Sequence, residues 1–514
     1  MDLTRLSAVL LYFSVLIAIG VMASRRMRDV RDYFAAGKRL SYWAASFSAR
    51  ATGESAWLLL GLTGMGAAVG IQAFWVVLGE VLGVGGAWLL MCRRFKRLTD
   101  RYDSITVPDY LESRFRDSSH RLRLVSAGCL VVFVTIYVSA QIDATGTAFE
   151  SFLGWNYYAG ALVGFGVVLV YITAGGFVAV AWSDVFQGAL MVAGLVFLPL
   201  IALGSMGPGE VASRLSEIDP HLLSWSGAAS WTPVAVANTL GLALIGLGFL
   251  GSPQVFVRFI ALRSADDIPK GSVVAVVWTI LADSGAVCIG LIGRALMTGP
   301  SDSLAEVLGP SGQEVLPLLA ESILPAFLVG LYIAVVLSAI MSTVDSLLIL
   351  AASAAVRDYY QRVRRPDLAD TALVATSRRA TLLFASLALA LALTVAVTTP
   401  DRTIFWFVIF GWSGIAATFC PIMILSLFWS GLTVRGALAG MITGFLGVPL
   451  FKFVAPLLPG VGTLFVGLAE LGPSFVLSGL VAVAVSLGDS QGRESLAGVK
   501  EELEEAARGG PGKG

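Results

Sequence analysis

The apolar residues of this chain gather into runs long enough for an α-helix to cross the roughly 30 Å hydrocarbon core of a lipid bilayer. Thirteen such runs begin near Leu6, Ser41, Ile71, Leu122, Trp155, Ala181, Val236, Gly271, Ser322, Ala380, Ile404, Ala437 and Leu464. In hydrocarbon every backbone polar group must be satisfied within its own segment, and helices achieve this. The pattern therefore predicts an all-α membrane protein with about 13 transmembrane helices.

Two of these runs contain residues that interrupt a regular helix. The second run carries Ala51-Thr52-Gly53-Glu54-Ser55 in its middle, and the seventh carries Gly246-Leu247-Gly248-Phe249-Leu250-Gly251-Ser252-Pro253. Broken backbone at membrane depth is tolerated where it lines a cavity inside the protein, as in many secondary transporters. The two breaks are five spans apart, and because five is odd, the units that contain them run in opposite directions. We expect two inverted repeats of five helices, at about 41–204 and 236–428, with one helix before and two after.

The composition supports a membrane protein, and the positions of the charges predict its orientation. The chain is 56% apolar and 14% charged, with 35 basic and 35 acidic residues, so nothing favours a nucleic-acid partner. Basic residues concentrate in alternate loops (25–39, 93–123, 258–270 and 357–379), whereas Arg214 is alone between Gly204 and Trp231. The positive-inside rule then predicts an external N-terminus and an internal C-terminus. One membrane domain, 1–487, precedes a charged cytoplasmic tail, 488–514, which we expect to be partly helical and then disordered.

The break in the second run offers oxygen ligands for a cation. Unwinding frees main-chain carbonyl groups such as those of Ala51 and Glu54, and hard cations such as Na⁺ prefer oxygen ligands. The alternative is a kinked packing helix with buried serines.

A second polar set, Ser338 to Ser346, lies in the ninth run. On a helix Ser342, Asp345 and Ser346 share one face, and Thr343 lies beside them. These hydroxyls and the carbonyl of Ala339 would complete a cation site that the second run begins. Serine and threonine also bond to carbonyls four residues back, which would explain the hydroxyls but not Asp345.

Other polar residues at membrane depth are candidates for function. Asp184, in Trp182-Ser183-Asp184 at the start of the sixth run, is either a functional carboxylate or part of a helix N-cap. Asp143 and Asp283 lie too deep in their runs to reach the interface, and Asp143 is a candidate partner for a substrate ammonium. The candidate substrate ligands around the cavity are Thr52, Gly53, Ser55, Trp57, Gln72, Phe74, Tyr137, Gln141, Phe249 and Ser252.

The chain carries no enzyme motif. It lacks a Walker A sequence, G-x-S-x-G, H-E-x-x-H and the protein-kinase set, so we expect a non-enzymatic carrier that moves a small-molecule solute with energy from an ion gradient. Two alternatives remain open: a proton-coupled carrier that uses Glu54 or Asp184, and a non-transporting membrane sensor of a solute.

Several motifs resemble the sodium/solute symporters, and among them the bacterial proline symporters, from about residue 5 to residue 455. The matching stretches are Asp32-Tyr33-Phe34 with Gly37-Lys38-Arg39-Leu40, Thr106-Val107-Pro108-Asp109-Tyr110-Leu111 with Arg114-Phe115, Gly175-Gly176-Phe177-Val178-Ala179-Val180-Ala181-Trp182-Ser183-Asp184 with Gln187, Pro253 with Arg258-Phe259, Ala339-Ile340-Met341-Ser342-Thr343, and Gly436-Ala437-Leu438-Ala439-Gly440-Met441. The resemblance implies a LeuT-like inverted-repeat fold, alternating access and coupling to Na⁺.

The resemblance also assigns sites. It places the main sodium site at the carbonyls of Ala51, Glu54 and Ala339 with the hydroxyls of Ser342 and Thr343. A second sodium site, present in some members, falls at Asp184, the Ser342 carbonyl, Asp345 and Ser346. Tyr137 matches an aromatic position that proline symporters use near the substrate.

The chain departs from the proline symporters in the presumed pocket. Where they carry an aspartate in the second span it has Gly53, and where they carry a tryptophan, a tyrosine and a glutamine near the seventh-span break it has Ile245, Phe249 and Ser252. The sodium ligands are kept while most of the proline pocket is replaced. We therefore expect a Na⁺-coupled symporter of the bacterial cytoplasmic membrane that imports a small solute, proline or a related zwitterionic amino acid.

Overall fold

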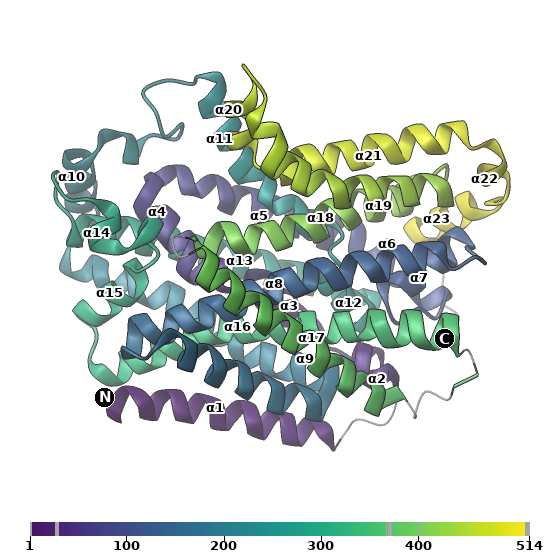
Figure 1. Cartoon of the computed structure of the whole chain (residues 1–514), viewed down its shortest axis with the longest axis horizontal. Helices are drawn as coiled ribbons and strands as arrows, with labels where there is room; N and C mark the ends of the chain where they lie inside the picture. The colour runs from purple at the N-terminus through teal and green to yellow at the C-terminus, as the bar shows by residue number, and fades with distance from the viewer. Residues whose placement is uncertain (1–2, 26–29, 366, 369–372, 400–401, 509–514) are drawn as a thin grey trace.

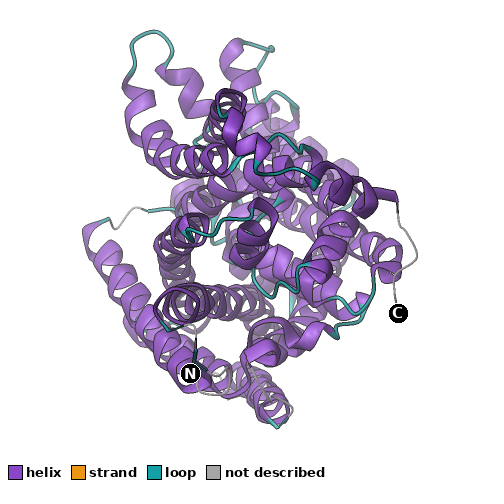
Figure 2. Cartoon of the chain, turned by 90° about the vertical axis from the view of Figure 1, so that its right-hand side faces the viewer, coloured by secondary structure: helices purple, strands orange, loops and turns teal. Residues whose placement is uncertain are grey.

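The structure is a computed structural model, and it describes residues 3–25, 30–365, 367–368, 373–399 and 402–508. Arg26 and Arg28 of the first basic loop and residues 509–514 of the predicted tail lie outside the described residues. The described chain consists of helices and loops, with one isolated bridge between Leu40 and Leu262 (Figure 2).

The helices that form the apolar runs lie roughly alongside one another in a single bundle (Figure 1). In the first half they are α1 (Leu3–Ser24), α3 (Tyr42–Glu54), α4 (Thr63–Val69), α5 (Phe74–Gly86), α6 (Cys92–Arg101), α8 (Arg121–Leu153) and α9 (Tyr157–Ser205). In the second half they are α11 (Pro233–Leu244), α12 (Pro253–Ala261), α13 (Ile268–Met297), α16 (Ala326–Ser353), α17 (Leu373–Thr398), α18 (Ile404–Phe428), α19 (Val434–Pro449) and α21 (Leu471–Gly488). The other helices lie in the connecting segments and in the last part of the chain: α2 (Val30–Ala35), α7 (Val107–Phe115), α10 (Pro208–Ile218), α14 (Leu304–Leu308), α15 (Val315–Ile323), α20 (Gly462–Leu468), α22 (Ser490–Glu494) and α23 (Val499–Arg508).

Among the described residues, 11 helices are long and apolar enough to cross a membrane. The difference from the expected 13 has a physical reason. The second predicted span is divided at its break: α3 has only 13 residues, and the segment after the break is counted together with the third predicted span as one candidate, Trp57–Arg101. A further apolar segment, Tyr157–Val170, is also short. The count of 13 stays a prediction.

Both predicted helix breaks are present. In the second span α3 ends at Glu54, where Ser55, with a φ of 63°, interrupts the helix. The helix resumes with a π-helical segment, η2 (Trp57–Leu62). In the seventh span a 3-10 segment, η6 (Ile245–Leu250), leads to Gly251 with a φ of 157°, and α12 restarts at Pro253. Glycine adopts such a φ without the steric cost of a side chain. Proline is tolerated in the first turn of a helix because an N–H group at that position has no acceptor within the helix.

The broken helix α3 lies at the centre of the bundle, where it packs against α9, α12, α13 and α16. Helix α16 is also interior. In the most apolar stretch of the span that begins with α16, 83% is buried, whereas the corresponding value for α17 is 28%. Large apolar side chains of α17, such as Leu383 and Leu387, are exposed and suit a lipid-facing surface.

Glycines bring the seventh-span break close to α5. A Cβ on Gly246 would lie 1.9 Å from the carbonyl oxygen of Gly79, and one on Gly79 would lie 1.9 Å from that of Ala243. Only residues without a side chain permit this approach of η6 to α5. Helix α5 is thereby fixed between the seventh-span break and α13.

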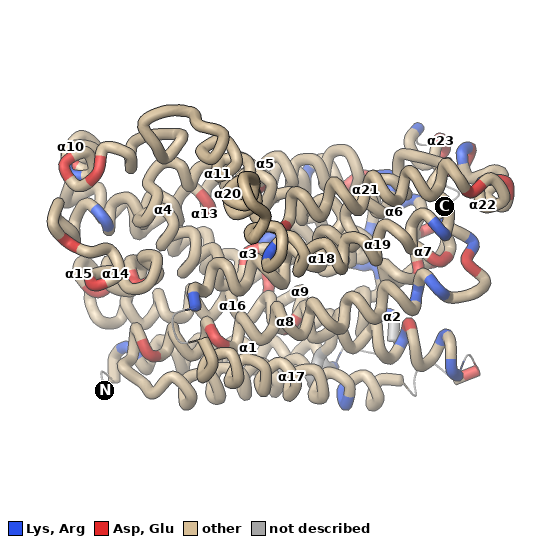
Figure 3. Tube along the Cα trace, turned by 45° about the horizontal axis from the view of Figure 1, so that its top comes forward, with Lys and Arg blue, Asp and Glu red and all other residues tan. Residues whose placement is uncertain are grey.

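Lysine and arginine residues gather at the end of the bundle that carries α6, α7 and α23 (Figure 3). The C-terminal helix α23 docks there through buried Val499, Leu503 and Ala506. Arg101 of α6 also pairs with Glu505, with 2.7 Å between Nη1 and Oε2. The last described part of the chain is therefore packed on the loop region between α6 and α7.

Candidate cation and solute site

The hydroxyls of α16 meet the carbonyls at the broken end of α3. Ser342 Oγ donates to the carbonyl oxygens of Ala51 (2.9 Å) and Ala339 (3.1 Å). Thr343 Oγ1 donates to those of Thr52 (3.1 Å) and Ala339 (3.2 Å). All these residues are buried. Four of the five predicted main-site ligands, all except the Glu54 carbonyl, are thus joined by hydrogen bonds.

These contacts agree with both interpretations of the polar residues in α16, the cation site and hydrogen bonding within the helix. Both hydroxyls bond back to the preceding turn of their own helix, as buried serine and threonine often do. They also reach across to α3, which back-bonding alone does not explain. The arrangement presents neutral oxygen atoms from two helices to one small volume, the chemistry that a hard cation prefers.

The residues of the possible second sodium site surround an arginine. Arg258 Nη2 lies 3.0 Å from Asp184 Oδ2 and donates to the hydroxyls of Ser346 and Thr52. The ion pair is fully buried. Ser346 Oγ also contacts Asp345 Oδ1 at 3.1 Å. A guanidinium therefore lies where the resemblance would place a second ion.

Asp184 is not an N-cap. Helix α9 is kinked at Gly176, whose φ is 55°, and continues as helix through Asp184 to Ser205. Its carboxylate accepts hydrogen bonds from Ser48, Thr52 and Arg258 on other helices. The N-cap alternative is therefore not supported, because the carboxylate of Asp184 bonds to residues of other helices.

Several of the candidate solute ligands adjoin the second-span break. Tyr137 donates to Ser55 Oγ at 3.3 Å, and Gln141 Oε1 accepts the main-chain N–H of Ala56 at 3.0 Å. Trp57 donates its indole N–H to the carbonyl of Gly53 at 3.3 Å. Because α8 supplies Tyr137 and Gln141, this helix directly fixes the first residues after the break.

An aromatic cluster covers Gly53. The ring of Phe249 lies 4.9 Å from that of Trp412, and the ring of Tyr137 lies 6.5 Å from that of Trp412. A Cβ on Gly53 would lie 2.6 Å from Cε1 of Phe249. The phenyl ring therefore fills the space that a side chain at position 53 would need.

Three candidates lie away from the second-span break. Gln72 donates to the carbonyl of Ser226 at 3.0 Å, and the ring of Phe74 packs against Trp225, 6.2 Å away. Both follow the end of α4 and contact the loop between α10 and α11 rather than the break. Gln72 also lines a cavity of about 290 Å³ together with Phe405, whose ring packs on Trp57. Ser252 is buried at the other break, where its hydroxyl lies 3.8 Å from Cys420 Sγ.

Asp143 is engaged by the protein itself. Arg402 Nε lies 3.0 Å from each carboxylate oxygen, and Tyr157 donates to Oδ1 at 2.6 Å. The three residues line a cavity of about 440 Å³. The expected pairing of Asp143 with a substrate ammonium is therefore replaced by an ion pair between α8 and the residues before α18.

Sequence reasoning did not select four residues of this region: Arg50, Glu80, Arg258 and Trp412. Glu80 carried a usable signal, since a lone carboxylate in an apolar span is functional by default. Arg50 was also detectable, because it precedes the second-span break by only one helical turn. Arg258 was noted only as part of a motif, and Trp412 looks like ordinary packing in an apolar run.

Comparison with known proteins identifies the family. The profile of the Sodium:solute symporter family matches residues 33–444. The chain belongs to this family. The high-affinity proline transporter PutP of Bacillus subtilis is 34% identical over 431 residues, which cover 84% of this chain and 88% of the relative. The sodium/proline symporter of Escherichia coli is 31% identical over 478 residues, covering 93% and 91%.

Solved structures show the same fold. A Na⁺-coupled sialic acid symporter in its substrate-bound outward-open state matches with a TM-score of 0.77 and 18% identity, over 95% of this chain and 98% of the other. MhsT in complex with L-phenylalanine matches with a TM-score of 0.52 and 16% identity, over 87% and 98%. The symporter therefore has the expected LeuT-like fold, is coupled to Na⁺ as its family is, and is a multi-pass membrane protein.

Proposed function

We propose that this symporter imports a small zwitterionic amino acid, proline or a close analogue, together with Na⁺ bound between the broken end of α3 and α16. The contact of Ser342 and Thr343 with the α3 carbonyls carries the proposal. It gathers the ligands of one cation from the two helices that must move relative to each other in alternating access.

The main sodium ligands are the carbonyls of Ala51, Glu54 and Ala339 with the hydroxyls of Ser342 and Thr343. The hydroxyl protons that now point at carbonyls turn away when Na⁺ enters, and the hydroxyl oxygens face the ion. Binding then joins α3 to α16 and favours the state in which the solute binds. Ion and solute thereby raise each other's affinity by the same factor.

The solute binds beside the break, where the polar atoms of Ser55 and Gln141 meet the rings of Trp57, Tyr137 and Phe249. Gln141 Nε2 is buried and makes no hydrogen bond to any described residue, which leaves a donor for a solute carboxylate. The names of the sequence relatives favour proline. The exchange of an aspartate for Gly53, with the ring of Phe249 in its place, makes the pocket more apolar than theirs.

At the second sodium site an ion would have to displace the guanidinium of Arg258 from Asp184 and Ser346. The buried pair of Arg258 with Asp184 already balances the local charge. We therefore assign Asp184, Asp345, Ser346 and the Ser342 carbonyl to the support of the main site, and do not place a coupling ion among them.

We infer that the basic end of the bundle faces the cytoplasm, by the positive-inside rule. Helix α1 begins at the opposite end and α23 lies at the basic end (Figures 1 and 3), which supports an external N-terminus and an internal C-terminus in the cytoplasmic membrane of a bacterium. Residues 41–204 and 236–428 are the two inverted repeats of the 1–487 membrane domain, and 488–514 is the cytoplasmic tail. The membership in a transporter family supports a carrier without enzymatic activity.

The test is uptake by purified protein in liposomes, with labelled proline first and then a panel of labelled amino acids. An inward Na⁺ gradient should drive accumulation of at least one of them, and an equal K⁺ gradient should not. Uptake that ignores Na⁺ but follows a pH gradient would support the proton-coupled alternative. Na⁺-dependent binding of a solute without any uptake would instead indicate a sensor.

A further inference from the structure

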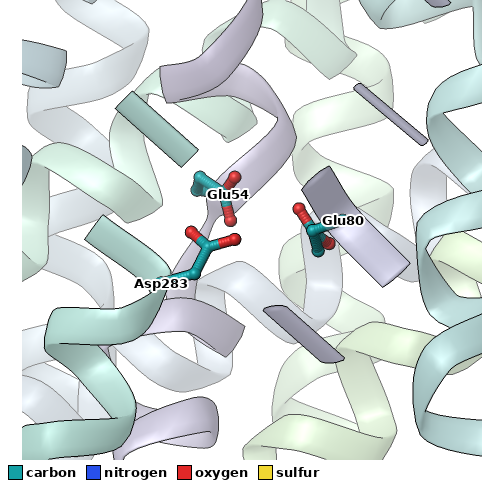
Figure 4. A group of neighbouring side chains, drawn as sticks. All are labelled: Glu54, Glu80 and Asp283. Carbon is teal, nitrogen blue, oxygen red and sulfur yellow. The ribbon is translucent and has the colours of Figure 1, made fainter. Parts of the chain in front are cut away.

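A second cluster of charged residues lies on the other side of α3. It consists of Arg50 and Glu54 of α3, Glu80 of α5 and Asp283 of α13, each at most 1% exposed. The three carboxyl groups offer oxygen atoms that all lie within 4.8 Å of one another. Figure 4 shows these groups directed toward a common space from three different elements.

The cluster has more negative than positive charge. Arg50 Nη2 pairs with Glu54 and lies 3.2 Å from Oε2 of Glu80. The guanidinium otherwise lies over aromatic rings, 4.6 Å from the centroid of Phe249 and 5.5 Å from that of Trp278. One guanidinium faces three carboxylates, and an uncompensated charge in such an apolar interior is costly.

Several carboxylate oxygen atoms of this cluster have no hydrogen-bond partner among the described residues. Neither carboxylate oxygen of Asp283 accepts a hydrogen bond from any described residue, and neither does Oε1 of Glu80. Asp283 is fully buried. Buried polar atoms in proteins nearly always have a partner, so an orphaned carboxylate directed at two others indicates a bound group that supplies positive charge.

We propose that Glu54, Glu80 and Asp283 form a Na⁺ site distinct from the main sodium site. A hard cation prefers carboxylate oxygens, and a separation of up to 4.8 Å suits ligands on opposite sides of an ion with bonds of roughly 2.3–2.6 Å, the range known for the similarly sized Ca²⁺. Full burial of all three side chains favours a single ion over the head of an organic cation, whose remaining atoms need room.

Charge balance favours a monovalent ion. The main site contains only neutral carbonyl and hydroxyl ligands, and one of them is the carbonyl of Glu54. An ion there and an ion in the carboxylate cluster add two positive charges beside Arg50, which together match the three carboxylates. Glu54 would then bind one ion through its main chain and the other through its side chain, so that each ion fixes the broken end of α3 for the other.

This inference rests on the proposed main site, and a count of bound Na⁺ separates the two. Equilibrium binding of radioactive Na⁺ to purified protein should give two ions per chain for the wild type. Asp283→Asn and Glu80→Gln should each reduce the count to one, and so should Thr343→Ala in the main site. Asp266→Asn, the same change at an exposed loop position, should leave two.

Two ions in both Asp283→Asn and Glu80→Gln would overturn the carboxylate site and leave the main site standing. Two ions in Thr343→Ala, with a loss in Asp283→Asn, would overturn the main site alone. Displacement of the cluster ion by Ca²⁺ at a concentration far below that of Na⁺ would contradict the assignment to a monovalent ion.

Thermal melting distinguishes the loss of the Na⁺ site from misfolding of a variant. Without Na⁺, Asp283→Asn should melt at a higher temperature than the wild type, because it removes an uncompensated buried charge. Na⁺ should raise the melting temperature of the wild type more than that of the variant. Equal Na⁺-induced shifts in the wild type, Asp283→Asn and Glu80→Gln would contradict the site.

Discussion

Phe249 Cε1 lies 2.6 Å from the position that a Cβ on Gly53 would occupy, so the side chain of one broken helix fills the space next to the other. Position 53 therefore tolerates no larger side chain while the Phe249 ring keeps this place. The pocket wall at the second-span break is a phenyl ring instead of a carboxylate.

This relationship predicts the behaviour of Gly53→Asp. The new side chain collides with the Phe249 ring, and overpacking of this kind costs about 1–3 kcal/mol. We expect a clear fall in the melting temperature of the purified symporter. Gly53→Asp should cost less stability in a Phe249→Ala background than in the wild type, because the cavity left by the ring receives the aspartate. Equal destabilisation by Gly53→Asp in the presence and absence of Phe249 would show that the contact is unimportant.

A second prediction concerns the ion pair of Asp184 with Arg258. Asp184→Asn leaves the buried guanidinium without its hydrogen-bonded carboxylate, and breaking a buried pair costs about 3–5 kcal/mol. Arg258→Gln should be similarly destabilising. The double variant should lose less than the sum of the two single losses, since neither charge is then left alone. Thermal melting of all four proteins measures this coupling, and strictly additive losses would argue against it.

The pair of Asp143 with Arg402 gives a third prediction. It joins α8 to the residues before α18 at the wall of the 440 Å³ cavity, and these elements belong to different proposed repeats. Arg402→Ala should reduce the initial rate of Na⁺-driven uptake severalfold, because the ends of the repeats lose a fixed contact. The charge-reversed double variant Asp143→Arg with Arg402→Asp should regain part of that rate. If the reversed pair transports no better than Arg402→Ala, the ion pair does not position the two elements.

Local sequence signals predicted much of the fold. Apolar runs marked the helices, and Gly251, Pro253 and the polar cluster around Ser55 marked both breaks, because helix interruption depends on a few neighbouring residues. The number of complete spans was harder to predict from the sequence. A broken helix has the composition of a span, but its two halves do not have the length of one.

The candidate site also has contacts that could be predicted from the sequence and contacts that could not. The joining of Ser342 and Thr343 to the α3 carbonyls was predictable, since each polar set occupies a short stretch of one helix. The partners of Asp143, Asp184 and Asp283 were not, because they come from helices distant in sequence that only the tertiary packing brings together. The partner of Gln72 was not predictable for a related reason: α4 ends at Val69, and the following turn carries the glutamine to the loop at Ser226.

The central claim is that Na⁺ binds between α3 and α16. The most direct measurement is the Na⁺ concentration that gives half-maximal solute uptake in liposomes, compared between the wild type, Ser342→Ala and Thr343→Ala. Ser338→Ala is the matched control, because its hydroxyl lies one turn earlier on α16 and bonds to the carbonyl of Ala334 at 2.7 Å.

Loss of one oxygen ligand to a charge is worth about 1.5–3 kcal/mol, which corresponds to a rise of roughly tenfold or more in the required Na⁺ concentration. We predict this rise for Ser342→Ala and Thr343→Ala, and an unchanged value for Ser338→Ala. The same half-maximal Na⁺ concentration in all four proteins would contradict the account.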